Sequence, residues 1–294
     1  MVKPVLPDPD WIVGKHGLMN VHALWRNGRT ELDPKSWRIP FQWQGYHYQD
    51  HDDEPFLPLL TSSGGFVEGD VSEFHAFLDP NTRMLATTTS ASKFYKCLEG
   101  KPSREIVDVS VGPGALFEYY TNEAIPFARS RVQRYIRIVM DLSSRLFATD
   151  LLSAGRVHYG AGEIFQFDSL VSVFEVMTDN RRLILDRLVA TKRRDIDALK
   201  RLWNGAYHMG TVFAYAPDLP KGVEDSAYEN CKRVDGTEIG VSRIGNVVVA
   251  RILSQETWQA HEAIYHMWEA VRPAIAGKPA KPIRTGSSPV GMGQ

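Results

Sequence analysis

The sequence has few cysteines, almost no net charge and no long hydrophobic run, and each of these absences excludes a class of protein. Cys97 and Cys231 stand alone, without a CxxC pair, which excludes a thiol-rich zinc site and suits a reducing compartment. A formal net charge of -1 argues against a nucleic-acid partner, because phosphate binding requires an excess of Lys and Arg. No apolar run approaches the roughly 18–20 residues that cross a bilayer, and there is no apolar signal core. We therefore expect a cytoplasmic protein without a membrane partner.

Catalytic signatures are also missing. The sequence has no Gly-x-Ser-x-Gly elbow, and neither cysteine has a neighbouring nucleophile motif. His261 and His266 flank a segment that resembles the HExxH zinc motif, but they are five residues apart. That spacing turns them roughly 140° away from each other on a helix, whereas the zinc motif keeps its histidines on one face. We expect that the protein is not an enzyme.

Turn-forming residues recur every 10 to 20 residues between runs rich in Thr, Val, Ile and aromatic residues. With 43% hydrophobic residues, such a chain is expected to fold into a packed globular body. The pattern predicts an all-β fold of antiparallel, multi-hairpin stacked sheets. The predicted turns lie at residues 80–81, 112–114, 141–144 and 178–181.

Two accessory α-helices are expected beside the sheets. Asp195 is placed to cap the first, and Ser254 to cap the second. An apolar stripe in the second helix includes Trp268 and precedes Pro273. The predicted organisation is an N-terminal segment packed on the body (1–57), a β-rich domain that includes the C-terminal helix (58–277) and a flexible tail (278–294).

A glycine-rich stretch at residues 64–70 ends in Asp70 and demands an unusual backbone path. One interpretation is a hairpin turn whose aspartate binds backbone N–H groups. The other makes Asp70 an inward carboxylate on a polar path for a divalent cation, with Lys93 and Tyr95 fixing the same interior surface.

The segment 47–54 combines two histidines and four carboxylates. It is either a solvated loop or a weak surface metal site with His47 and His51 as nitrogen ligands. His75, His158 and His208 are expected to be structural.

Taken together, these motifs resemble the UreD (also called UreH) family of urease accessory proteins. Five ordered segments between residues 58 and 284 carry the resemblance, and residues 1–57 match poorly. The segments are Gly-Gly…Gly-Asp at 64–70, Thr-Thr…Lys-x-Tyr at 87–95, Gly-Ala-Leu-Phe-Glu with Glu123 and Phe127 at 114–127, Gly-Arg…Gly-Glu-x-Phe at 152–165, and the strand and helix from Val248 through Trp268 and Arg272 to Arg284. The family often has prolines where residues 61–63 are Thr-Ser-Ser, and the Gly-Arg to Gly-Glu interval is two residues longer here.

The resemblance implies a urease maturation factor: a chaperone and scaffold that assists Ni²⁺ delivery into apo-urease together with UreF and the GTPase UreG. No cofactor is expected to be tightly bound, and Ni²⁺ is in transit through a polar interior passage. Asp70, Glu118 and Glu163 are the carboxylates expected along the passage. The residues expected to line the passage or to shape its motifs are Gly64, Gly65, Gly69, Thr87, Thr88, Lys93, Tyr95 and Arg156.

Two alternatives remain open at this point. A metal-assisted hydrolase would use His47, His51 and nearby carboxylates around a tightly bound ion. A β-rich binding module would keep the fold without a role in urease maturation.

Overall fold

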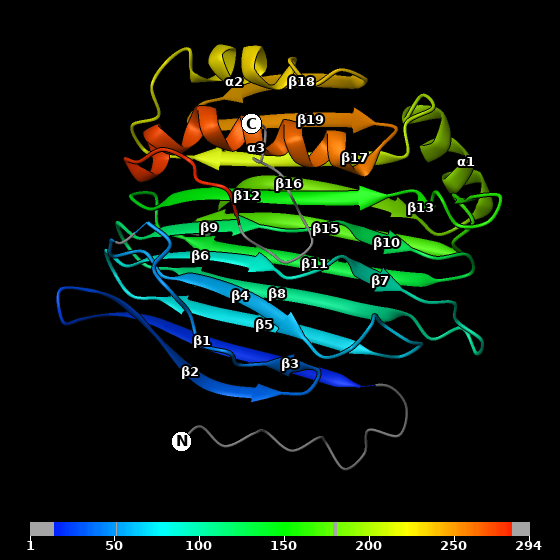
Figure 1. The fold of residues 1–294 in the computed structure, drawn as a ribbon, viewed down its shortest axis with the longest axis horizontal. Helices are drawn as coiled ribbons and strands as arrows, with labels where there is room; N and C mark the ends of the chain where they lie inside the picture. Colours follow the sequence, from blue (N-terminus) through cyan, green and yellow to red (C-terminus); the bar gives the residue numbers. More distant parts are fainter. Residues whose placement is uncertain (1–14, 51, 179–180, 284–294) are drawn as a thin grey trace.

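The computed structural model describes residues 15–50, 52–178 and 181–283, which form two β-sheets stacked face to face with three helices around them (Figure 1). Within these residues one sheet has seven strands, in the order β16-β15-β11-β8-β5-β1-β2. Its strands are β1 (His16–Arg26), β2 (Arg29–Arg38), β5 (Val71–Leu78), β8 (Ser103–Val111), β11 (Arg131–Met140), β15 (Ser169–Thr178) and β16 (Arg181–Ala190).

The second sheet has ten strands among the described residues, eight of them in the order β18-β19-β17-β12-β9-β6-β4-β3. Two short strands, β7 and β10, pair with each other beside β12, and a separate pair joins β13 to β14. The bounds are β3 (Phe41–Gln42), β4 (Phe56–Thr61), β6 (Arg83–Thr88), β7 (Ser92–Phe94), β9 (Leu116–Tyr120), β10 (Ala124–Pro126), β12 (Arg145–Ser153), β13 (Gly155–Arg156), β14 (Glu163–Ile164), β17 (His208–Tyr215), β18 (Thr237–Ile244) and β19 (Val247–Ser254).

The predicted antiparallel, multi-hairpin pairing is wrong for the centre of both sheets. There β1, β5, β8, β11 and β15 pair in parallel, as do β4, β6, β9 and β12. The turns at 80–81, 112–114 and 141–144 join a strand of one sheet to a strand of the other, so the chain winds as a coil. A hairpin and such a corner both need only a short turn between two strands, and the sequence pattern does not distinguish them.

Successive corners of this coil stack on one another. The Gly112 N–H donates to the Leu78 carbonyl at 2.9 Å, and the Asn81 N–H donates to the Pro113 carbonyl at 2.9 Å. Antiparallel hairpins occur toward the sheet edges, where β15 pairs with β16 as predicted, although residues 179–180 of that turn lie outside the described residues.

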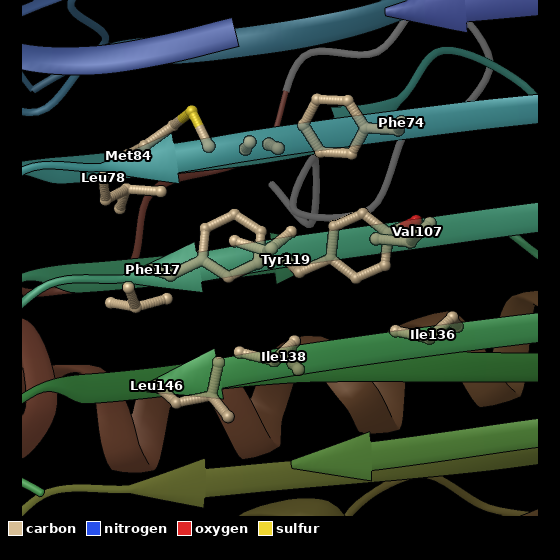
Figure 2. Packing of buried hydrophobic residues seen from close by; sticks show 14 of the residues in the cluster. Phe74, Leu78, Met84, Val107, Phe117, Tyr119, Ile136, Ile138 and Leu146 are labelled. Carbon is tan, nitrogen blue, oxygen red and sulfur yellow. The ribbon is translucent and has the colours of Figure 1, made fainter. Parts of the chain in front are cut away.

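Alternation along the strands builds the core between the two sheets (Figure 2). Residues two apart on one strand point to the same face, so every second side chain enters the core. Ile136 and Ile138 of β11 pack against Phe117 and Tyr119 of β9 and their neighbours, all with 3% or less of their surface exposed.

Helices α1 (Arg193–Leu202) and α3 (Thr257–Ala276) confirm the two predicted helices, and α2 (Val223–Cys231) is an additional one. Asp195 lies in the first turn of α1 and accepts the N–H groups of Thr191 and Lys192. The predicted cap of α3, Ser254, is instead the last residue of β19, and Glu256 takes the N-cap position.

The apolar face of α3 packs on the outer face of the ten-stranded sheet, and Ile264 and Trp268 are fully buried there. The helix continues through Pro273 to Ala276, and Gly277 ends it. Within the described residues, no helix combines the length and the apolarity that crossing a membrane requires.

Candidate functional site

The glycine-rich loop is closed by Asp70, as the sequence suggested. Its carboxylate is buried and accepts the backbone N–H of Lys15 at 2.6 Å and of Val67 at 2.9 Å. Gly69 adopts a φ of 77°, a left-handed conformation that favours glycine. Asp70 therefore fixes the turn and joins it to the residue that precedes β1.

The loop packs directly against the segment that carries Lys93 and Tyr95. The Phe66 N–H donates to the Lys93 carbonyl at 2.7 Å, and the Tyr95 hydroxyl donates to the Gly64 carbonyl at 2.8 Å. A Cβ on Gly65 would lie 2.5 Å from the Lys93 carbonyl oxygen, so this close approach requires glycine. Two motifs that are separate in the sequence thus form one surface.

That surface borders a cavity of about 60 Å³ between the two sheets. Strands β5 and β8 contribute residues from one sheet, and β4, β6 and β9 from the other. Four residues predicted for the passage line it, whereas Glu118 and Glu163 are not among its lining residues. The four are Gly65, Asp70, Thr88 and Lys93.

A buried charge network continues from the cavity into the interior. Glu105 lines the cavity and accepts hydrogen bonds from the Ser92 hydroxyl at 2.7 Å and from Arg134 Nε at 2.6 Å. Arg134 is 3% exposed, and its Nη1 donates to Asp150 at 2.6 Å and to Ser172 at 3.3 Å. The network links the two sheets, because Arg134 and Ser172 belong to one and Asp150 to the other.

The sequence analysis missed this network, although its signal is the position of each residue in its strand. Glu105 has the same parity as Val107 in β8, and Arg134 the same parity as Ile136 in β11. Both apolar residues are buried in the core between the sheets. A charged residue at an inward position is therefore a readable sign of an interior polar site.

The two threonines of the second motif differ in their surroundings. Thr87 is buried in β6. Thr88 lines the cavity, and its hydroxyl accepts the Asn122 backbone N–H at 2.8 Å. The cavity wall is thereby tied to the segment between β9 and β10.

Glu118 lies on the other side of the ten-stranded sheet, beneath α3. Its carboxylate is fully buried and accepts the indole N–H of Trp268 and the Nε–H of Arg272, the latter at 3.0 Å. Breaking a buried charged pair of this kind is strongly destabilising. The position holds the helix on the sheet.

Arg272 also connects Glu118 to the acidic segment 47–54. Its Nη2 donates to Asp50 at 2.9 Å and to Glu54 at 3.2 Å. The Lys278 ammonium lies at 3.0 Å from Asp50 and at 2.5 Å from both Asp52 and Glu54. Burial, together with the charge of Glu118, raises the pKa of Glu54 to about 8.

Asp50, Asp52 and Glu54 form the one carboxylate group among the described residues whose spacing suits a metal ion, but the lysine ammonium lies among them. His47 packs its ring on Phe56, with centroids 4.7 Å apart. His51 and Arg284 lie outside the described residues, as does the tail from residue 284 onward.

Glu163 pairs with Arg156 across the short β13–β14 ladder. The hydrogen bond from Arg156 holds the pKa of Glu163 below its usual range. The Glu163 carboxylate also accepts the backbone N–H of Ala128 at 3.2 Å. The Arg156 guanidinium also lies over the rings of Phe127 and Tyr159. These contacts join the segment at 152–165 to the segment at 114–127.

The two histidines of the HExxH-like segment have different partners. His261 is buried and contacts Glu123 at 2.9 Å, whereas His266 contacts Glu269 at 2.8 Å. The two side chains thus have different partners, as expected for histidines five residues apart on a helix.

Comparison with known proteins gives one consistent family. The family model described as UreD urease accessory protein matches residues 15–287. A relative named urease accessory protein UreD 2 from Brucella suis is 26% identical over 281 residues, covering 92% of this chain and 91% of the relative. Urease accessory protein UreD from Pseudomonas paraeruginosa is 28% identical over 233 residues, covering 78% and 80% respectively.

Proposed function

Because the chain belongs to the UreD family of urease accessory proteins, which supports urease maturation, we propose that it delivers Ni²⁺ into apo-urease. The observation that carries the proposal is the cavity between the sheets, a largely apolar space with the polar residues Asp70, Thr88 and Glu105 at its wall. The ion is cargo in transit, and no tightly bound cofactor takes part.

The carboxylates at the cavity wall support the proposal. Oxygen ligands such as those of Asp70 and Glu105 accept Ni²⁺ without the tight binding of a thiolate cage. Glu105 leads on to Arg134 and Asp150, so carboxylates line the interior on both sides of one buried guanidinium. Because that guanidinium repels a cation, an ion in the cavity would exchange between the weak oxygen ligands at the cavity wall rather than move along the Arg134 network.

In this proposal Glu118 and Glu163 do not bind the ion but stabilise the fold around the passage. Each carboxylate is paired with an arginine, and each pair fixes an element next to the polar interior. The passage is thus carried by residues that line the cavity, and the other motif residues maintain its shape.

The proposed partners are UreF, the GTPase UreG and the urease apoprotein. The chain then acts as a scaffold and chaperone in a complex, with Ni²⁺ released by the GTPase entering the interior described above. A cytoplasmic location follows from these partners.

Co-expression of the cognate urease genes with and without this chain tests the proposal. We expect urease to lack nickel when this chain is omitted and to regain it when the chain is supplied in trans. Copurification of the chain with UreF and with urease is expected in the same cells. Full nickel content per urease active site without the chain would overturn the delivery role.

A further inference from the structure

The ten-stranded sheet ends at β18, a long edge strand with an open outer side. β18 is the terminal strand of its sheet, and among the described residues its only strand partner is β19. The pairing with β19 runs from Thr237 to Ile244 without a shift in register. An open edge presents a row of backbone N–H and C=O groups, which is a template for pairing with another strand.

The strands at the other ends of the two sheets carry features that disfavour such pairing. β2 contains Pro34, and its pairing with β1 has a shift in register. β3 is two residues long. β16 carries four charged residues, and its pairing with β15 also has a shift in register. Proline, bulges, charges and short length each protect an edge, and β18 has no proline, no bulge and full length.

The turn between β18 and β19 determines which backbone groups face the open side. Ile244 faces Val247 across the two-residue turn Gly245-Asn246, and such a closing pair exchanges both of its backbone hydrogen bonds. Hydrogen-bonded and non-hydrogen-bonded pairs alternate along an antiparallel ladder, so every second residue of β18 points its N–H and C=O outward. These residues are Thr237, Ile239, Val241 and Arg243.

The two charged residues of β18 are both engaged within the chain. Arg243 contacts Glu224 at 3.1 Å, and Glu238 accepts a hydrogen bond from the Asn204 side-chain amide at 3.3 Å. Between them Gly240 is exposed, and a Cβ added there would meet no atom within 4 Å. The middle of the strand is therefore uncharged and open to a second backbone.

We propose that two copies of this chain pair through β18, antiparallel and about a twofold axis at Gly240. In this register Ile239 of one copy faces Val241 of the other, and both already pack on the core beneath α3. Thr237 faces Arg243, and Glu238 faces Ser242. The outward backbone groups of the two edges then meet, since odd-numbered residues face odd-numbered residues.

The sequence of β18 is complementary to itself in this register, which favours a second copy over a strand of another protein. Branched apolar side chains pair across the strands, and no like charges face each other. Two glycines meet at the axis, where the strands approach most closely. The interface is isologous, and it does not depend on the nickel-delivery role.

Sedimentation velocity of the purified chain over a concentration series tests the pairing. We expect the wild type to dimerise as its concentration rises. Gly240→Lys and Gly240→Glu should each weaken dimerisation roughly 10-fold or more, because like charges then face each other at the axis. Gln44→Lys is the matched control, since Gln44 is exposed just after β3, the opposite end of the same sheet. A wild-type chain that is monomeric at every concentration would overturn the proposal.

Mixing the two charge variants distinguishes lost pairing from lost folding. In an equimolar mixture the introduced lysine of one copy faces the introduced glutamate of the other, so dimers are expected to return. A mixture that stays monomeric while the wild type dimerises would contradict pairing at Gly240.

Disulfide formation tests the register itself. Directly opposite Cα atoms in a non-hydrogen-bonded antiparallel pair lie about 4.5 Å apart, which is within disulfide range. With oxidised glutathione, Gly240→Cys is expected to give a covalent dimer and Ser242→Cys little, because position 242 faces Glu238 of the second copy. The native Cys97 and Cys231 are both buried. Equal cross-linking of the two variants would show that the register is wrong.

Discussion

At the scale of single residues, two carboxylates with the same predicted role have different surroundings. Asp70 closes a turn at the cavity wall, whereas Glu118 is enclosed by Trp268 and Arg272 beneath α3. In the structure, the segment that carries Lys93 and Tyr95 packs on the loop that Asp70 closes. The sequence did not show that Glu118 has an arginine partner, because Arg272 lies 154 residues further along the chain.

Replacement of Glu118 is expected to act on stability. Glu118→Gln removes the buried carboxylate that accepts the Nε–H of Arg272, and removing one member of a buried pair costs about 3–5 kcal/mol. Urea unfolding of the purified variant measures this loss. Glu99→Gln is the matched control, since Glu99 is exposed and its change is expected to stay within about 0.5 kcal/mol. A Glu118→Gln protein as stable as the wild type would contradict the structural role.

The buried His208 predicts a dependence of stability on pH. Its pKa falls from 6.5 to about 4 on folding because of burial, so between these values the unfolded chain binds a proton that the folded chain does not. Stability should therefore fall as the pH is lowered through this window, by at most about 1.4 kcal/mol per pH unit.

Unfolding curves of the wild type and of His208→Asn across that window isolate the effect. The difference in unfolding free energy between the two proteins is expected to shrink steadily as the pH falls. A difference that stays constant between about pH 6.5 and pH 4 would show that His208 is protonated equally in both states.

At the scale of elements, the strands and two of the three helices were predictable from periodicity, but the connections between strands were not. The runs on either side of residues 112–114 alternate as strands should, and the structure has β8 and β9 there. Whether such a turn makes a hairpin or crosses to the opposite sheet depends on distant strands. Helix α2 escaped prediction because Val223, Ala227 and Cys231 give it only a narrow buried face.

The stacked corners of the coil predict opposite effects for two glycines. A Cβ on Gly112 would lie 2.7 Å from the Leu78 carbonyl and 3.0 Å from the Pro80 nitrogen, so Gly112→Ala is expected to cost about 1–3 kcal/mol. Gly240 in β18 has no atom within 4 Å of such a Cβ, and Gly240→Ala should be neutral or slightly stabilising.

Thermal unfolding of the two glycine variants checks this difference. Equal melting temperatures would contradict the close approach of the corners, which exists because β5 and β8 pair in parallel.

At the scale of the whole molecule, the two sheets stack face to face and α3 covers the far face of one of them (Figure 1). The cavity lies between the two sheets. The family and the β-rich class were accessible from ordered motifs, since local turn chemistry repeats along the chain. The interior network of Glu105, Arg134 and Asp150 was not predicted, because its members come from three strands that only the coil brings together.

The central claim is that the cavity carries nickel, and the most direct measurement is nickel per urease active site with the cavity filled. Ala91 lines the cavity, so Ala91→Leu should obstruct it, while Ala161→Leu makes the same change at an exposed turn. Both variants are co-expressed with the urease genes and compared at equal levels of the folded chain. The account predicts nickel loading near that of cells lacking the chain for Ala91→Leu and wild-type loading for Ala161→Leu. Wild-type loading with a folded Ala91→Leu protein would contradict it.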